Sequence, residues 1–217
     1  MKKIFTLLSI TLGALFLSCT TGVEESPEPG ILRVTLKANE ADSILVILGD
    51  TARCSRVDRY NVIVSRGRVY RGENYADLYL TPSIDRIAAD TVNLIQRQWL
   101  DGRWVNSITD PFEIPRWQTR YVGYTVFEWY TPPGTYDKLQ FALTGIEVFV
   151  AIPRQFNNPL QLPEGVSSVM DFPASITVEE GKVTEVQMEI DAFKSIRRYR
   201  DTYIFDRVVR IKKIEMK

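Results

Sequence analysis

Histidine is absent from this 217-residue chain, and cysteine occurs only twice. Without an imidazole the chain cannot build a Ser-His-Asp triad or a Cys-His dyad, and it lacks the side chain that titrates nearest to neutral pH. With only two cysteines and no histidine, a structural zinc site is not expected either. Carboxylate chemistry is the main route to hydrolysis that these absences leave open.

A net charge of one sign is also absent, because 27 basic residues balance 27 acidic residues. There is therefore no basic field to attract nucleic acid, and no nucleic-acid partner is expected. The sequence contains no Gly-rich phosphate loop and no Asp-x-Asp-x-Asp-Gly calcium loop. We expect no cofactor.

The N-terminus has the pattern of a lipoprotein signal. Lys2 and Lys3 precede an uncharged stretch, residues 4–17. That stretch is shorter than the ~20 apolar residues that span a bilayer, but it is typical of a secretory signal. Cys19 follows directly, after a small residue, so we predict that residues 1–18 are removed and that Cys19 is lipidated. An uncleaved anchor and an ordinary signal cut elsewhere are the alternatives.

Residues 19–30 are polar, acidic and rich in proline, which predicts a disordered tether. Residues 31–217 are then the folded domain, attached to the membrane through the N-terminal lipid. This organisation predicts a protein of the bacterial cell envelope. Thr20 stands where an acidic residue would retain some lipoproteins at the inner membrane, which favours the outer membrane, on its periplasmic face or at the cell surface.

The folded part is dominated by a hydrophobic period of two residues, which predicts β-strands. The predicted strands are 32–36, 44–48, 60–64, 75–80, 95–100, 103–108, 121–130, 138–152, 175–178, 185–191 and 203–214. About ten strands with little helix predict an all-β fold, an antiparallel β-sandwich, with a barrel as the alternative. One domain fits this length, and two lobes split near residues 111–115 are also compatible with it.

Two glycines carry specific predictions. Asp101-Gly102 predicts a two-residue type I′ turn that pairs Trp99 with Trp104. The apolar residues in 84–99 also fit helical spacing, which is a competing interpretation. Gly145, inside the predicted strand 138–152, predicts a β-bulge.

Aromatic residues are concentrated between residues 99 and 136, where all four tryptophans lie. Exposed rings would stack on sugars or anchor a protein partner, whereas buried rings would fill the core. Trp117, Trp104 and Trp99 are the candidate ligand-stacking residues. The strand 121–130, which contains Trp129, is apolar on both faces, so we predict that it is central and buried.

A cysteine, a group of arginines and a set of carboxylates each have a functional and an ordinary structural interpretation. Cys54 lies between Arg53 and Arg56, which would make its thiol reactive, unless it is a semi-buried and inert thiol. The arginines of residues 197–200 would contact anionic lipid heads or acidic glycans, unless they form a solvated loop. A glycan hydrolase needs two facing carboxylates. The candidates are Glu128, Asp137, Glu147, Asp171 and Asp191, which otherwise are solvated surface charges.

Four segments resemble a family of bacterial lipoproteins known only as a domain of unknown function, with an immunoglobulin-like or transthyretin-like sandwich. The four similar segments are 31–36, which follows the tether, 132–141, which reads Pro-Pro-Gly-Thr-Tyr-Asp-Lys-Leu-Gln-Phe, 183–196, which ends Asp-Ala-Phe-Lys-Ser-Ile, and 205–211. The resemblance departs from the family pattern at residues 38–40. It implies a fold and a location, but no activity and no catalytic residue.

Together these features predict a non-enzymatic, lipid-anchored envelope protein with a binding or assembly role, with no catalytic residue and with a glycan or an envelope protein as partner. The alternative is a carbohydrate-binding module that uses surface aromatics. A carboxylate-based glycan hydrolase is the third hypothesis.

Overall fold

The structure, a computed structural model, describes residues 26–54, 56–81, 90–104, 113–152 and 156–217. These residues form strands and no helix, which confirms the predicted all-β fold. No helix in this part of the chain is long and apolar enough to cross a membrane. The strands are β1 (Gly30–Ala38), β2 (Ile44–Ile47), β3 (Asp50–Arg53), β4 (Arg56–Arg71), β5 (Asn74–Leu78), β6 (Thr91–Trp104), β7 (Glu113–Tyr121), β8 (Tyr124–Thr131), β9 (Gly134–Ile152), β10 (Phe156–Leu160), β11 (Val169–Val178), β12 (Val183–Ile190), β13 (Ile196–Tyr199), β14 (Thr202–Phe205) and β15 (Val209–Met216).

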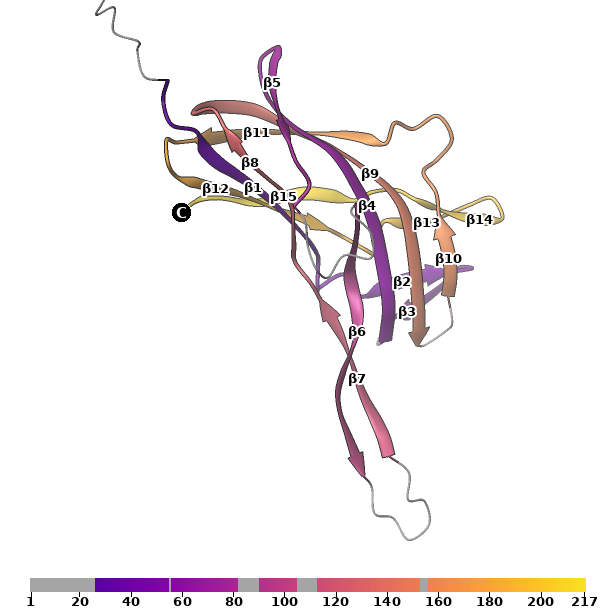
Figure 1. Cartoon of the computed structure of the whole chain (residues 1–217). Helices are drawn as coiled ribbons and strands as arrows, with labels where there is room; N and C mark the ends of the chain where they lie inside the picture. Colours follow the sequence, from indigo (N-terminus) through magenta and orange to yellow (C-terminus); the bar gives the residue numbers. More distant parts are fainter. Residues whose placement is uncertain (1–25, 55, 82–89, 105–112, 153–155) are drawn as a thin grey trace, which may run out of the picture.

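Two large sheets form the body of the molecule (Figure 1). The first has four strands in the order β15-β12-β1-β8. The second has the order β10-β9-β4-β6-β7, with β11 also beside β9 and β5 also beside β4. Most pairs are antiparallel, as predicted, but β1 and β12 are parallel. Because these two strands are far apart in the sequence, no hairpin constrains their relative direction.

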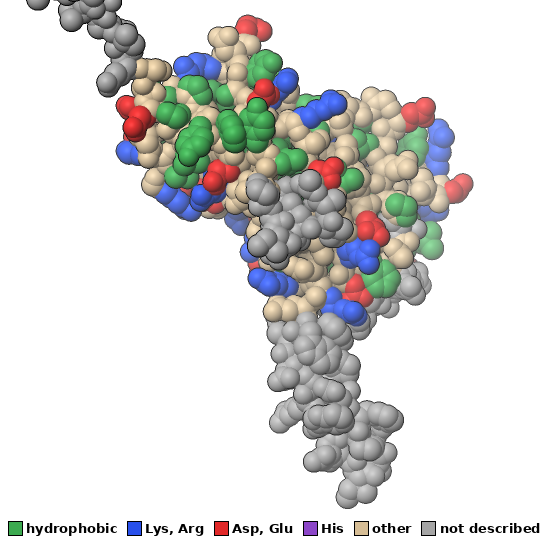
Figure 2. Space-filling view, viewed as in Figure 1, with side chains coloured by type: hydrophobic (Ala, Val, Ile, Leu, Met, Phe, Trp, Pro, Cys, Tyr) green, Lys and Arg blue, Asp and Glu red, His purple; other side chains and the backbone are tan. Residues whose placement is uncertain are grey.

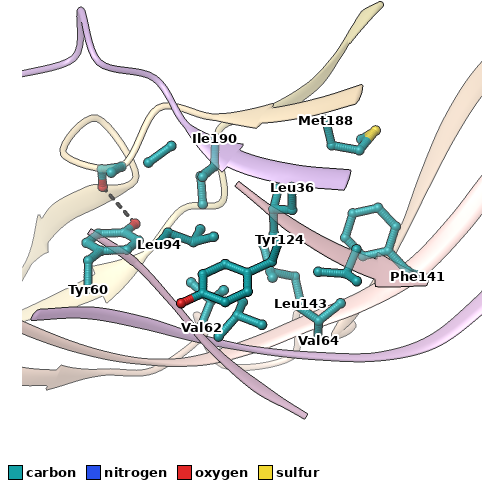
Figure 3. Close-up of a cluster of buried hydrophobic side chains, with 14 of the residues drawn as sticks. Leu36, Tyr60, Val62, Val64, Leu94, Tyr124, Phe141, Leu143, Met188 and Ile190 are labelled. Carbon is teal, nitrogen blue, oxygen red and sulfur yellow. Dashed lines mark hydrogen bonds between the residues drawn. The ribbon is translucent and has the colours of Figure 1, made fainter. Parts of the chain in front are cut away.

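The core lies between the two sheets, as expected for a sandwich. In β1 the side chains of Leu32, Val34 and Leu36 are fully buried, and the alternate residues point away from the core. Figure 3 shows Leu36 and Met188 of the four-stranded sheet facing residues of the larger sheet, including Val64. Complete burial of each such aliphatic side chain stabilises the fold by about 1.5–3 kcal/mol.

One hydrophobic cluster includes residues from both sheets and from both sides of positions 111–115. Within it, Phe127 of β8 lies against Gly67 of β4, where a Cβ atom would come within 2.7 Å of the ring. Glycine is therefore required at position 67 by the close approach of the two sheets.

The two longest strands, β4 and β9, pair along most of their lengths and bend through several bulges. Gly145 lies at one of them, because Val62 pairs with Ile146 and Ile63 pairs with Thr144. Its φ of 48° is in the left-handed region, where glycine is favoured. The predicted bulge at this position is confirmed.

The predicted turn at Asp101-Gly102 is wrong. Strand β6 continues through both residues, and β7 pairs with it so that Gly102 lies opposite Pro115. The buried residues Val92 and Leu94 hold the start of β6 in the core, and its later part leaves the body together with β7 as a two-stranded ribbon (Figure 1). Residues 91–99 are therefore strand rather than helix, while residues 82–89 and 105–112 lie outside the described residues.

Candidate functional site

For the candidate lipidation and ligand-stacking residues, the structure describes no side chain. Cys19 lies within residues 1–25, outside the described residues. Trp99 and Trp104 belong to β6 and Trp117 to β7, but only their backbones are described. The register places Trp99 opposite Trp117, not opposite Trp104 as predicted. Two of the three candidate tryptophans thus occupy facing positions on the ribbon.

The fourth tryptophan, Trp129, contradicts the prediction that its strand is central and buried. Strand β8 is the last strand of its sheet, and among the described residues the short segment after β5 lies beyond it. That segment accepts a hydrogen bond from the Glu128 backbone N–H at the Tyr79 carbonyl, at 3.2 Å, and forms a bridge between Leu80 and Phe127. The side chains just past this contact are open to solvent: Trp129 is 44% exposed and Tyr130 is 62% exposed.

Trp129 and Tyr130 form an exposed aromatic cluster with Tyr79, which is 54% exposed. We call these three residues the aromatic platform. The ring centroids of Tyr79 and Trp129 are 4.2 Å apart, and those of Trp129 and Tyr130 are 6.3 Å apart. Figure 2 shows hydrophobic side chains gathered on the face where β5 and β8 lie. Ordered and exposed rings of this kind are a surface for ligand binding.

The shape of the platform is curved. The planes of Tyr79 and Trp129 are inclined by 48°, and those of Trp129 and Tyr130 by 67°. Rings inclined in this way cannot all lie against one flat surface, but they can contact successive faces of a flexible or twisted ligand. Beside them, Arg33 and Glu128 form an ion pair that supplies polar groups at the border of the platform.

The five candidate carboxylates are each engaged with a cation or a hydrogen-bond donor. Their partners are Arg33 for Glu128, the Gly72 N–H for Asp137, Arg59 for Glu147, Lys138 and Gln140 for Asp171, and Arg210, Lys194 and Asn39 for Asp191. The Gln140 hydrogen bond lowers the pKa of Asp171 below its usual range. Burial acts to raise the pKa of Asp191, but hydrogen bonds from Arg210 and Asn39 outweigh it, and the pKa is lowered. A general acid needs a raised pKa, which these two groups do not have.

Cys54 does not have the properties of a reactive thiol. Burial, followed by the charge of Asp42, raises its pKa to about 11, although a backbone hydrogen bond at Leu45 acts in the opposite direction. The raised pKa favours the semi-buried, inert thiol over the reactive one, because desolvation of the thiolate is the largest influence on it.

A second buried carboxylate, that of Asp42, is hydrogen-bonded to the segment 183–196, which resembles the lipoprotein family. Its carboxylate accepts hydrogen bonds from the backbone N–H groups of Phe193, at 2.7 Å, and Lys194, at 3.1 Å. Burial raises the pKa of Asp42 in spite of these two hydrogen bonds. Phe193 itself is buried and packs edge-to-face on Tyr60, so the segment closes one end of the core.

Metal binding has no support in the described ranges, where no group of three or more Cys, Asp or Glu side chains is placed to hold an ion. The comparisons give no further guide, since no known protein family, curated protein or solved structure matches the chain. The resemblance to lipoproteins of unknown function stays a prediction.

Proposed function

We propose that this chain is a non-enzymatic, lipid-anchored protein of the bacterial cell envelope that acts by binding, with the aromatic platform as its contact surface. The observation that carries the proposal is the contact of the exposed Trp129 ring with two other exposed rings, those of Tyr79 and Tyr130. Large aromatic side chains exposed together are the usual anchors of binding interfaces. The engaged carboxylates described above support a role without catalysis.

The anchor is proposed on the sequence alone. Cys19 carries the lipid after removal of residues 1–18, and Thr20 next to it favours the outer membrane. Radiolabelled palmitate supplied to a bacterium that expresses the chain should label it, and a Cys19→Ser variant should remain unlabelled. Absence of label from the unmodified chain would remove the anchor from the proposal.

Binding is tested by sedimentation with envelope fragments from which the lipid has been extracted, so that neither the lipid anchor nor a membrane surface carries the chain down. We expect the unmodified chain, solubilised from the membrane in detergent, to sediment with the fragments and Trp129→Ala to lose at least tenfold in affinity, as a hot-spot truncation of about 2 kcal/mol would give. Tyr199→Ala is the matched control, since Tyr199 is 45% exposed but lies on β13, away from the platform. Equal sedimentation of all three proteins would exclude the platform as the contact surface.

A glycan is the second, more specific candidate for the ligand. The inclined rings of Tyr79 and Trp129 favour a single, flexible sugar chain over a flat polysaccharide surface. A glycan array probed with the unmodified chain should show binding that Trp129→Phe retains in part and Trp129→Ala abolishes. If no sugar on the array is bound, the ligand of the platform is a protein or another envelope component.

A further inference from the structure

A groove of about 640 Å³ lies at the other end of the molecule, between the β2–β3 hairpin and β13. It brings together residues that are distant in the sequence, Ile44, Val46 and Leu48 from the hairpin and Lys194, Arg197 and Arg198 around β13. We call this surface the basic groove. The arginines were predicted to lie in a solvated loop, but residues 197 and 198 belong to a strand, and the turn that follows begins at Arg200.

The hairpin side of the basic groove is apolar and open to solvent. Leu45 and Ile47 alternate inward and are buried, while Ile44 is 53% exposed and Val46 is 49% exposed. Strand β2 is therefore apolar on both faces, although one of them faces solvent. Contiguous exposed aliphatic side chains of this kind usually mark a contact surface.

The tip of the hairpin adds a third aliphatic side chain in an unfavourable backbone conformation. Leu48 has a φ of 52° and Gly49 a φ of 89°, which are the positive values of a type I′ turn. Asn or Gly is the usual residue at the first position, but here it is a leucine that is 62% exposed. The Leu48 backbone N–H donates to the Tyr203 hydroxyl at 2.9 Å, which fixes the tip against the body.

The opposite side of the basic groove is cationic. Lys194 and Arg197 are each mostly exposed, and their ion pairs with Asp191 and Asp206 are long, at 3.5 and 3.4 Å. Among the lining residues the one carboxylate is that of Asp42, which accepts the backbone hydrogen bonds described above. A groove with an apolar side and an opposite basic side complements a ligand that is both apolar and anionic.

We propose that the basic groove docks on an anionic membrane surface, with Leu48 and Val46 among the acyl chains and Arg197 and Arg198 against lipid phosphates. Aliphatic side chains beside Lys and Arg are the usual composition of such surfaces. This docking role goes beyond the binding role proposed for the aromatic platform. It rests on the proposed lipid anchor, which brings the chain to a membrane.

The length of the chain permits this arrangement. Figure 1 shows the β2–β3 hairpin at the far end of β1 from the described N-terminal residues. Nine residues of β1 span about 30 Å. The Glu28 backbone N–H donates to Glu180, so nine residues, Cys19 to Pro27, are left as tether, and they reach at most about 30 Å. A chain anchored at Cys19 can therefore lie along the bilayer with the basic groove against it.

The test uses the full chain reconstituted in vesicles. A polarity-sensitive fluorophore is attached at Thr51→Cys, next to Val46 in the hairpin register and exposed, in a Cys54→Ser background that removes the other free thiol of the domain. Flotation first selects the protein that is bound to vesicles, so failure of the anchor is seen separately. We expect a blue shift and loss of iodide quenching on equal parts of phosphatidylglycerol and phosphatidylcholine, but not on phosphatidylcholine alone.

Two double variants separate local charge from net charge. Arg197→Gln with Arg198→Gln should weaken docking by about fivefold for each arginine and reverse the shift. Arg66→Gln with Lys213→Gln removes the same charge from other faces and should leave the shift unchanged. Four results would each overturn the proposal. The fluorophore could fail to shift, could shift equally on both lipids, or could respond equally in the two double variants. It could also shift in the same way with soluble poly-glutamate in place of anionic lipid.

Discussion

The aromatic platform and the basic groove lie at opposite ends of β1 and present different chemistry to solvent. The platform is next to the start of the strand, where Tyr130 pairs with Ile31, and it consists of rings. The groove follows the end of the strand and consists of aliphatic side chains with a basic rim. One small sandwich thus presents two separate exposed surfaces, for which we propose different partners: sugars or proteins at the platform and anionic lipid at the groove.

The two surfaces also differ in what lies beneath them. Phe193 lines the groove but is itself part of the core, where it packs on Tyr60. Tyr60 in turn donates a hydrogen bond to the Ala192 carbonyl at 2.9 Å, which Figure 3 shows as a dashed line. The platform rings, in contrast, are each 44–62% exposed. Truncation of a side chain beneath the groove should therefore destabilise the whole fold. Truncation of a platform side chain should have a smaller, local effect.

Truncation of Phe193 gives the largest expected effect. Phe193→Ala leaves a cavity at a fully packed position and should lower the free energy of unfolding by about 3–5 kcal/mol. Trp129→Ala, at a half-exposed position, should cost about 1 kcal/mol. Chemical denaturation of the two variants measures both values, and similar losses would show that the platform is as much a part of the core as Phe193.

Acid should weaken the end of the sandwich that carries the groove. Burial acts to raise the pKa of Asp191 and Glu189, but hydrogen bonds from Arg210, joined by Lys212 at Glu189, outweigh it and lower both. A lowered folded pKa adds stability above the ordinary value and loses it as the pH falls through the folded value. The free energy of unfolding should therefore decrease as the pH falls below the ordinary glutamate value of 4.5.

The contribution of Asp42 to stability depends on pH in the opposite direction, which allows a second test. Burial raises its pKa in the folded state, so its contribution is largest below its ordinary value of 3.8 and is lost as the pH rises. Asp42→Asn, which keeps an oxygen for the Phe193 N–H, should make the loss of stability in acid steeper. A pH series of denaturation midpoints would contradict this explanation if the variant had the shallower slope.

The smallest expected effect is a gain in stability. Leu48→Asn should raise the free energy of unfolding by up to about 1 kcal/mol, because asparagine tolerates the left-handed conformation better than leucine. Val46→Asn, in the regular part of the same hairpin, should lower it by about 1 kcal/mol. If Leu48→Asn stabilises the chain but weakens docking on anionic vesicles, the leucine serves contact at the expense of stability.

The local pattern of the sequence predicted much of the sandwich. The alternation in Leu32, Val34 and Leu36 predicted β1, and Gly145 predicted the bulge in β9, because both features depend on neighbours along the chain. The exposure of Trp129 was not predictable in this way, since a strand that is apolar on both faces can be central or terminal. Its place is decided by which distant strands pair with it, and in the part of the chain that the structure describes, the partner on the outer edge of β8 is one short segment.

The sequence predicted that the candidate site is aromatic, but not which aromatic residues form it. The concentration of aromatic residues between 99 and 136 is evident, yet Trp117, Trp104 and Trp99 were preferred to Trp129 as ligand-stacking residues. The turn preference of Asp101-Gly102 was overridden by the pairing of β6 with β7. The parallel pairing of β1 with β12, and the groove between β2 and β13, join segments with no local signal for each other.

Binding at Trp129 can be tested by titrating glycan fragments and following the NMR signals of the four tryptophan indole N–H groups, assigned with one Trp→Phe variant each. The Trp129 signal should move first and saturate with the binding curve, and Tyr79→Ala should suppress the movement. Movement of the Trp99, Trp104 or Trp117 signals while that of Trp129 stays still would instead place binding on the β6–β7 ribbon and rule out the aromatic platform.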